Sequence, residues 1–137
     1  MTTALRSVAS VLIFMSVAMT SLNAAADWQL QGLYRAEGVD AEGAPYRALV
    51  RIIKFGDSHL VSWTFGSESE ALDEPDRIGV GIARGDVLAV SYFSEDFAGV
   101  VLYEIESDGR RLVGHWTGAG GDGVLRAETL TRLERPR

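Results

Sequence analysis

The chain contains no cysteine, and it has only two histidines among its 137 residues. Without cysteine there is no disulfide and no thiolate ligand for a metal. His59 and His115 without a third ligand make a weak zinc site, since zinc in proteins takes at least three protein ligands. We therefore expect a fold that is held by its core alone, with no metal and no cofactor.

Long apolar runs are also scarce, and the one that exists lies at the N-terminus. It extends from Val8 to Leu22, about 15 residues, which is shorter than the roughly 20 residues that a membrane-spanning helix needs. Arg6 precedes the run, and the small residues Ala24 and Ala26 follow it. This layout is typical of a cleaved secretory signal. We predict a helical signal peptide over residues 1–26 and a mature domain over residues 27–137 that is periplasmic or secreted.

Positive charge is in the minority. The whole chain carries a net charge of −6, and removal of Arg6 with the signal would leave −7. An acidic surface argues against nucleic acid and against anionic membrane surfaces as partners. The mature chain has the length of one domain, so we expect a single core and no stable membrane insertion after signal cleavage.

Apolar and polar residues alternate with a period of two along most of the mature chain. In the segment 46–55, for example, the face of Tyr46, Ala48, Val50 and Ile52 alternates with a face that carries Arg47 and Arg51. This pattern is typical of strands with one buried face. It predicts strands over residues 28–37, 46–55, 59–66, 77–84, 86–93, 99–106, 111–118 and 123–133.

The breaks between these segments are short and rich in glycine and aspartate, as in Gly56-Asp57 and Asp108-Gly109. Such pairs favour tight hairpin turns, so consecutive strands should pair antiparallel. Eight short strands joined in this way predict an all-β domain, a single antiparallel eight-stranded up-and-down barrel, with a curled β-sandwich as the alternative. Glycines inside the strands fit a small, strongly coiled barrel; they are Gly32, Gly79, Gly81 and Gly114.

One of the turns contains the tripeptide Arg84-Gly85-Asp86, which is known as an adhesion signal. The backbone of a hairpin reversal requires the same residue types, so a turn without any adhesive role explains them equally. Both interpretations remain open at this stage.

No catalytic constellation is visible in the sequence. Ser58 and His59 are adjacent but lie in a turn, not in the strand-to-helix elbow that presents a nucleophile. The acidic segment from Glu68 to Asp76 could bind calcium, but it lacks the regular ligand spacing of a calcium loop, and a solvated loop explains it as well. We therefore expect a protein that is not an enzyme.

Aromatic residues are the most informative feature, because most of them fall on predicted strands. Rings that point into an eight-stranded barrel either line a cavity for one small apolar ligand or fill the interior. The candidate ligand-binding residues are Tyr34, Trp63, Tyr92, Tyr103 and Trp116.

The order of short motifs resembles a group of small exported bacterial β-proteins. The matching residues are Gly32, Tyr34, Tyr46, Val50, Ile52, Val61, Trp63, Gly79, Gly81, Leu88, Val90, Tyr92, Val101, Tyr103, Gly114 and Trp116. Members of that group are often labelled uncharacterised and sometimes fibronectin-binding. The resemblance implies an exported barrel of the avidin- or lipocalin-like kind, and it brings no established catalytic residue. The chain departs from the pattern at Ala48, where a glycine is expected.

The sequence thus predicts an exported, non-enzymatic binding module for a small apolar ligand or for an extracytoplasmic protein. Two alternatives use loops instead of the interior. A periplasmic inhibitor of a hydrolase or protease would act through residues 66–77, and a matrix adhesin would act through Arg84-Gly85-Asp86.

Overall fold

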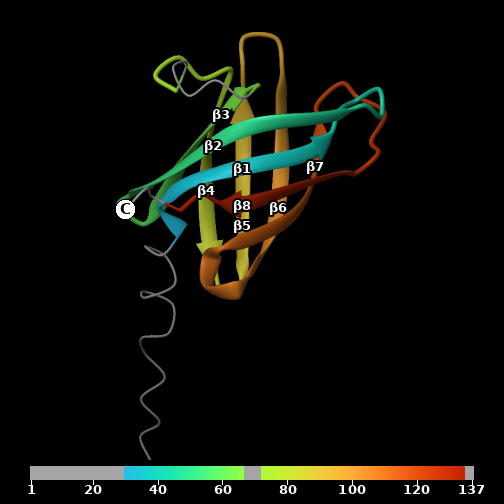
Figure 1. Ribbon diagram of the computed structural model, residues 1–137. Coiled ribbons are helices and arrows are strands. Elements are labelled where there is room, and N and C mark those ends of the chain that lie inside the picture. Colours follow the sequence, from blue (N-terminus) through green and yellow to red (C-terminus); the bar gives the residue numbers. More distant parts are fainter. Residues whose placement is uncertain (1–29, 67–71, 135–137) are drawn as a thin grey trace, which may run out of the picture.

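The computed structural model describes residues 30–66 and 72–134 (Figure 1). The predicted signal peptide, residues 1–26, lies outside the described residues, as does the predicted start of the mature domain. None of the helical segments in the described ranges has the length and hydropathy to cross a membrane.

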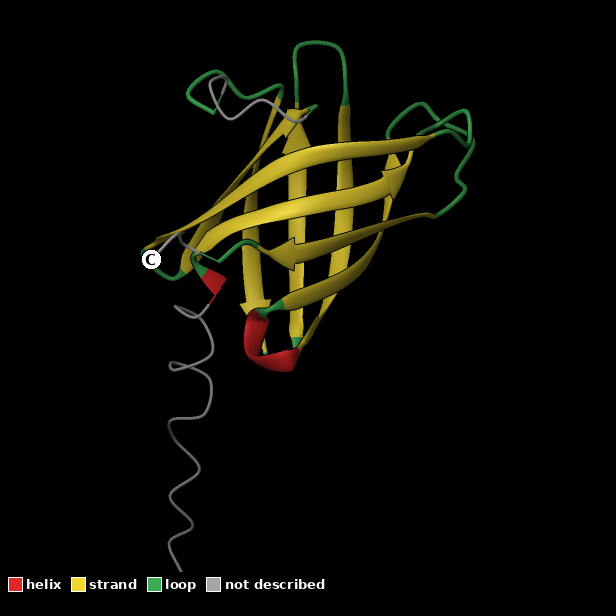
Figure 2. Cartoon of the chain, viewed as in Figure 1, coloured by secondary structure: helices red, strands yellow, loops and turns green. Residues whose placement is uncertain are grey.

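The described residues form eight strands that close into a barrel (Figures 1 and 2). The strands are β1 (Gly32–Val39), β2 (Pro45–Phe55), β3 (Ser58–Phe65), β4 (Arg77–Arg84), β5 (Val87–Phe93), β6 (Ala98–Glu106), β7 (Arg111–Gly118) and β8 (Arg126–Arg132). Each strand pairs antiparallel with its neighbours in sequence, and β1 also pairs antiparallel with β8. The up-and-down barrel is therefore confirmed, and the β-sandwich alternative is wrong, because no sheet edge is left open.

Two strands begin three or more residues away from their predicted start. The first strand begins at Gly32, not at Trp28, because Leu30 lies in a 3-10 segment. The Leu30 carbonyl accepts a hydrogen bond from the Tyr34 hydroxyl at 2.8 Å. The last strand begins at Arg126, not at Gly123, because Gly123 has a φ of 75° and belongs to the loop after β7.

The up-and-down topology gives the barrel two unlike ends. At one end, which we call the turn end, the chain reverses in short connections after β2, β4 and β6, where the last includes the 3-10 segment Ser107–Gly109 (Figure 2). At the other end, the loop end, connections follow β1, β3, β5 and β7, and all except the β5–β6 loop are longer than those of the turn end. Side chains near the start of an even-numbered strand and near the end of an odd-numbered strand therefore meet at the loop end.

The hairpin prediction for Arg84-Gly85-Asp86 is confirmed. β4 ends at Arg84 and β5 begins at Val87, and Gly85 has a φ of 61°, in the left-handed region that glycine adopts readily. All three residues are exposed at the turn end. The turn geometry accounts for the residue types, and an adhesive role stays a prediction.

The turn end is sealed by side chains. Tyr34 is fully buried, and its hydroxyl lies 2.8 Å from the Leu30 carbonyl and 3.1 Å from the Gly109 carbonyl. Arg132 donates to that hydroxyl at 2.7 Å, and its guanidinium carbon lies 5.0 Å from the Tyr34 ring centroid. These contacts tie β1, the β6–β7 connection and β8 together across the turn end.

Glycines on the inner wall leave room for large neighbours. A Cβ on Gly114 would lie 2.4 Å from Cδ1 of Tyr103 and 2.8 Å from the Leu102 carbonyl oxygen. Both distances are far below van der Waals contact, and the second atom is backbone that cannot move aside cheaply. The barrel wall at Gly114 therefore tolerates no side chain.

Gly114→Ala is accordingly expected to lower the free energy of unfolding by about 1–3 kcal/mol, as overpacking of a core does. Urea unfolding followed by circular dichroism measures the change. The matched control is Gly121→Ala in the β7–β8 loop, where a Cβ meets only the Gly118 carbonyl oxygen at 3.3 Å; its expected effect is within about 0.5 kcal/mol. Equal losses in the two variants would contradict the crowding argument.

Candidate functional site

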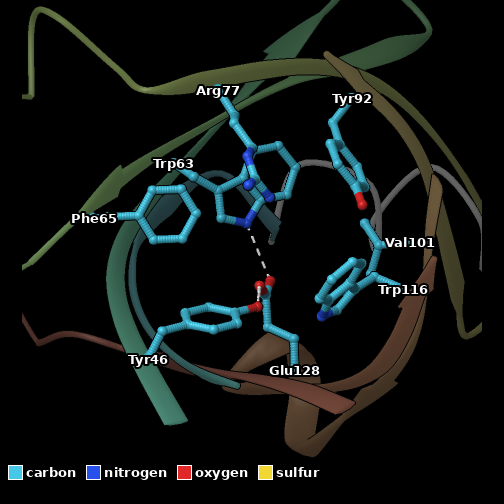
Figure 3. A pocket seen from close by; sticks show the side chains of 8 residues that line it. All are labelled: Tyr46, Trp63, Phe65, Arg77, Tyr92, Val101, Trp116 and Glu128. Atoms are coloured by element: carbon cyan, nitrogen blue, oxygen red, sulfur yellow. Dashed lines mark hydrogen bonds between the residues drawn. The ribbon is translucent and has the colours of Figure 1, made fainter. Parts of the chain in front are cut away.

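The loop end holds a small cavity whose walls come from seven different strands, β2 to β8 (Figure 3). The lining residues are Tyr46, Trp63, Phe65, Arg77, Tyr92, Val101, Trp116 and Glu128. The volume of the cavity is about 10 Å³, which is about the room that one water molecule needs. The aromatic side chains thus fill the interior at this end, and a larger guest requires some of them to move.

Glu128 is the buried carboxylate of the site. It projects inward from β8 and is only 4% exposed. Nε1 of Trp63 donates to its Oε1 at 3.1 Å, the Tyr103 hydroxyl donates to the same oxygen, and the Tyr46 hydroxyl donates to Oε2. Three neutral donors therefore hold one negative charge in the interior, an arrangement that satisfies the desolvated oxygens without supplying a positive charge.

The environment keeps these phenols protonated. Burial and then the negative charge of Glu128 raise the pKa of Tyr103 well above its ordinary value, and the same causes raise the pKa of Tyr46. Burial also raises the pKa of Tyr92 to about 12, although the positive charge of Arg77 opposes the shift. The hydroxyls thus remain hydrogen-bond donors over the physiological range of pH.

The rings above this carboxylate form a continuous series. The centroid distances are 5.6 Å from Trp63 to Tyr92, 5.9 Å from Tyr92 to Phe97, and 6.2 Å from Phe97 to Trp116. The polar atoms of two rings point to backbone, since the Tyr92 hydroxyl donates to the Thr117 carbonyl and Trp116 Nε1 donates to the carbonyl at the end of β1, each at 3.2 Å. The polar atoms of these two rings are therefore satisfied, and their faces remain available for contacts in the interior.

Arg77 completes the site. Its guanidinium carbon lies 4.5 Å from the ring centroid of Phe97, 4.9 Å from that of Phe65 and 5.8 Å from that of Tyr92. Within residues 30–66 and 72–134, no carboxylate or hydrogen-bond acceptor pairs with this guanidinium. The contacts that hold it are the faces of three aromatic rings, at distances typical of cation–π interactions.

The five candidate residues from the sequence are divided between the two ends. Trp63, Tyr92 and Trp116 line the cavity, and Tyr103 lies beside it as a donor to the buried carboxylate. Tyr34 lies in the seal of the turn end and does not line the cavity. The structure therefore brings four of the five together and separates the fifth from them.

Sequence reasoning missed Tyr46, Phe65, Arg77, Phe97 and Glu128 as residues of the site. One signal was available for Glu128, because it lies on the same strand face as the leucine two residues later, which is fully buried. A charged residue at an otherwise apolar alternate position indicates a buried partner network. Phe97 lies in the β5–β6 loop, where no periodicity could identify it.

The two histidines do not form a site. His59 is fully buried on the inner wall, and His115 is exposed on the outer wall. In the described part of the chain, no group of three metal-ligating side chains comes together. The acidic segment considered for calcium includes Glu68 and Glu70, which lie outside the described residues.

Comparison with known proteins supports the fold and no more. No family model and no curated protein matches the chain. A redesigned β-barrel matches with a TM-score of 0.65 and 15% identity over 84% of this chain and 100% of that one. Another redesigned β-barrel, mFAP1 bound to DFHBI, matches with a TM-score of 0.62 and 12% identity over 79% and 99%. A de novo designed fluorescence-activating β-barrel matches with a TM-score of 0.57 and 14% identity over 80% and 98%.

Proposed function

We propose that this protein is an exported barrel that binds one small molecule at its loop end. The observation that carries the proposal is the asymmetry of the barrel. Five aromatic side chains, a buried carboxylate and a guanidinium that has no acceptor among residues 30–66 and 72–134 converge at the loop end, whereas Tyr34 and Arg132 seal the turn end. Convergent aromatic faces with a few placed polar groups are typical of small-molecule sites.

Binding is favoured over catalysis by the state of the polar groups. Protein donors already occupy both oxygens of Glu128, so the carboxylate has little capacity left to take a proton from a substrate. Aromatic faces contribute contact area and no reactive group. The site therefore supports recognition of a ligand without its conversion.

Room for the ligand arises if Phe97 moves. A second hollow of about 230 Å³ lies at the loop end, lined by Phe97 and Trp116 together with residues of the β7–β8 loop. Phe97 belongs to a loop, so its displacement breaks no strand pairing. The joined space approaches the roughly 300 Å³ of the smallest ligand pockets. That a redesigned barrel of similar fold is bound to DFHBI supports a ligand within this architecture.

Native mass spectrometry of the protein purified from its own host tests the proposal. We expect a reproducible additional mass that disappears on denaturation. Tyr92→Leu should lower the bound fraction about tenfold or more, because it removes one wall of the site. Phe93→Leu is the matched control, since Phe93 is the next residue on β5 and is half exposed on the outer wall. A bare protein mass, or equal losses in both variants, would refute a ligand at the loop end.

A further inference from the structure

The three rings around Arg77 form a cage, which we define as Phe65, Tyr92 and Phe97. We propose that this cage is a binding site for the organic cation of a ligand, such as a methylated ammonium group, and that Arg77 occupies it in the absence of ligand. The inference rests on the proposed function and specifies the chemical class of the ligand.

The geometry of the cage suits a soft, weakly hydrated cation. Its rings come from three different elements, β3, β5 and the β5–β6 loop, and each centroid lies within 6 Å of the Arg77 guanidinium carbon. Ring faces attract positive charge and accept almost no hydrogen bond. The ring faces accept almost none of the five N–H groups of the guanidinium, so these donors depend on solvent, which Arg77 reaches because it is partly exposed. A methylated ammonium, which has few donors or none, would lose less on entering.

The charge distribution below the cage favours the same ligand class. Glu128 lies in the same lining as Arg77, and its three hydrogen-bond donors are neutral. Arg126, another arginine of this end, is already paired with Asp122 at 2.8 Å. A cation that replaces Arg77 in the cage faces the buried carboxylate in its place, which favours a cation over a neutral or an anionic ligand. The net charge of −6 also draws cations toward the protein.

An anion would meet the opposite conditions. It would gain hydrogen bonds to Arg77, but it would lie against the negative faces of the cage and near the carboxylate of Glu128. Exchange of one cation for another leaves the charge of the cage unchanged. The exchange is sterically simple, because Arg77 is the first residue of β4, is partly exposed, and carries a long side chain that can extend into solvent.

The test is a titration of the full purified protein with choline, followed by tryptophan fluorescence, because Trp63 and Trp116 line the site. The neutral isostere of choline, in which carbon replaces nitrogen, is the matched probe. We expect choline to bind about tenfold or more tightly than this isostere. Arg77→Ala should tighten choline binding about tenfold further. Without the Arg77 side chain in the cage, the state that can bind choline is no longer a minor one. Arg77→Lys, which keeps a competing cation, should remain close to the wild type.

Three results would overturn the inference. One is equal affinity for choline and its isostere, and another is weaker choline binding in Arg77→Ala. The third concerns the analogue of the isostere that carries a carboxylate. If the wild type binds this anion and Arg77→Ala does not, Arg77 is an anchor for anions. If Arg77→Ala fails to fold, Phe97→Leu is the deciding variant, because it alters only a loop residue of the cage. It should lower the affinity for choline about tenfold. Unchanged affinity in Phe97→Leu also overturns the inference. If native mass spectrometry detects a ligand that is lost in Tyr92→Leu, but choline does not bind, the proposed function stands and only the inference of a cationic ligand is overturned.

Discussion

Glu128→Ala is expected to lower the free energy of unfolding by about 4 kcal/mol. The substitution removes the acceptor for Tyr46, Tyr103 and Trp63, and all three donors lie in the interior. Each buried donor that is left unsatisfied costs about 1–3 kcal/mol, and the space left by the side chain adds a cavity term. Urea unfolding measures the loss, and the midpoint should fall without a change in slope.

Two further variants identify the cause. Glu104→Ala removes a carboxylate from the exposed face of β6 and should change the stability by no more than about 0.5 kcal/mol. Addition of Tyr46→Phe and Tyr103→Phe to Glu128→Ala should recover part of the loss, because the orphaned hydroxyls are removed. If the triple variant is less stable than Glu128→Ala alone, the donors are not what the carboxylate stabilises.

The second large effect is expected in alkali. The chain has four tyrosines, and burial is the leading cause that raises the pKa of each of them above the ordinary 10.0. The folded protein therefore retains protons that the unfolded chain releases above that value. The stabilisation is complete below pH 10 and declines as the pH rises, by about 1.4 kcal/mol per pH unit for each tyrosine. Tyr92 contributes this loss up to its folded-state pKa of about 12, and the other three tyrosines add to it, so the protein should lose its stability in the alkaline range above pH 10.

Tyrosinate absorbance and far-ultraviolet circular dichroism, recorded together against pH, check this expectation. Both signals should change in one cooperative transition, with no tyrosinate near pH 10 while the dichroism is intact. Tyr92→Phe should make the transition shallower, since three shifted groups remain instead of four. Ionisation of one or two tyrosines at the ordinary pKa in a folded protein would contradict the burial described above.

The strands and their pairing could be predicted because alternation and turn chemistry are local properties. Which side chains of a strand point into the barrel was harder to predict. In β4 the apolar side chains of Ile78, Val80 and Ile82 point outward, and the inward positions between them are Gly79 and Gly81. Hydrophobicity alone favours the reverse orientation. Crowding decides, because a Cβ on Gly79 would lie 2.7 Å from a backbone oxygen of β5.

The site was only partly predictable because it depends on register between distant strands. The candidate rings Trp63 and Trp116 do lie on the inner face, but the end of the barrel at which a ring lies depends on its position along the strand. The same rule selected Tyr34, which lies at the other end. The contact between Trp63 and Glu128 joins residues 65 positions apart, and no local pattern encodes such a distance.

The pairing of β1 with β8 also sets the order of events as the chain is made. Tyr34 meets Arg132 across 98 positions of sequence, so the barrel cannot close until β8 has left the ribosome. Until then β1 and β7 each present an open edge. The two edges of the sheet, which are far apart in sequence, must still be brought together. Closure is therefore the late step of folding, and a chain that lacks its last strand retains two edges that can pair with other chains.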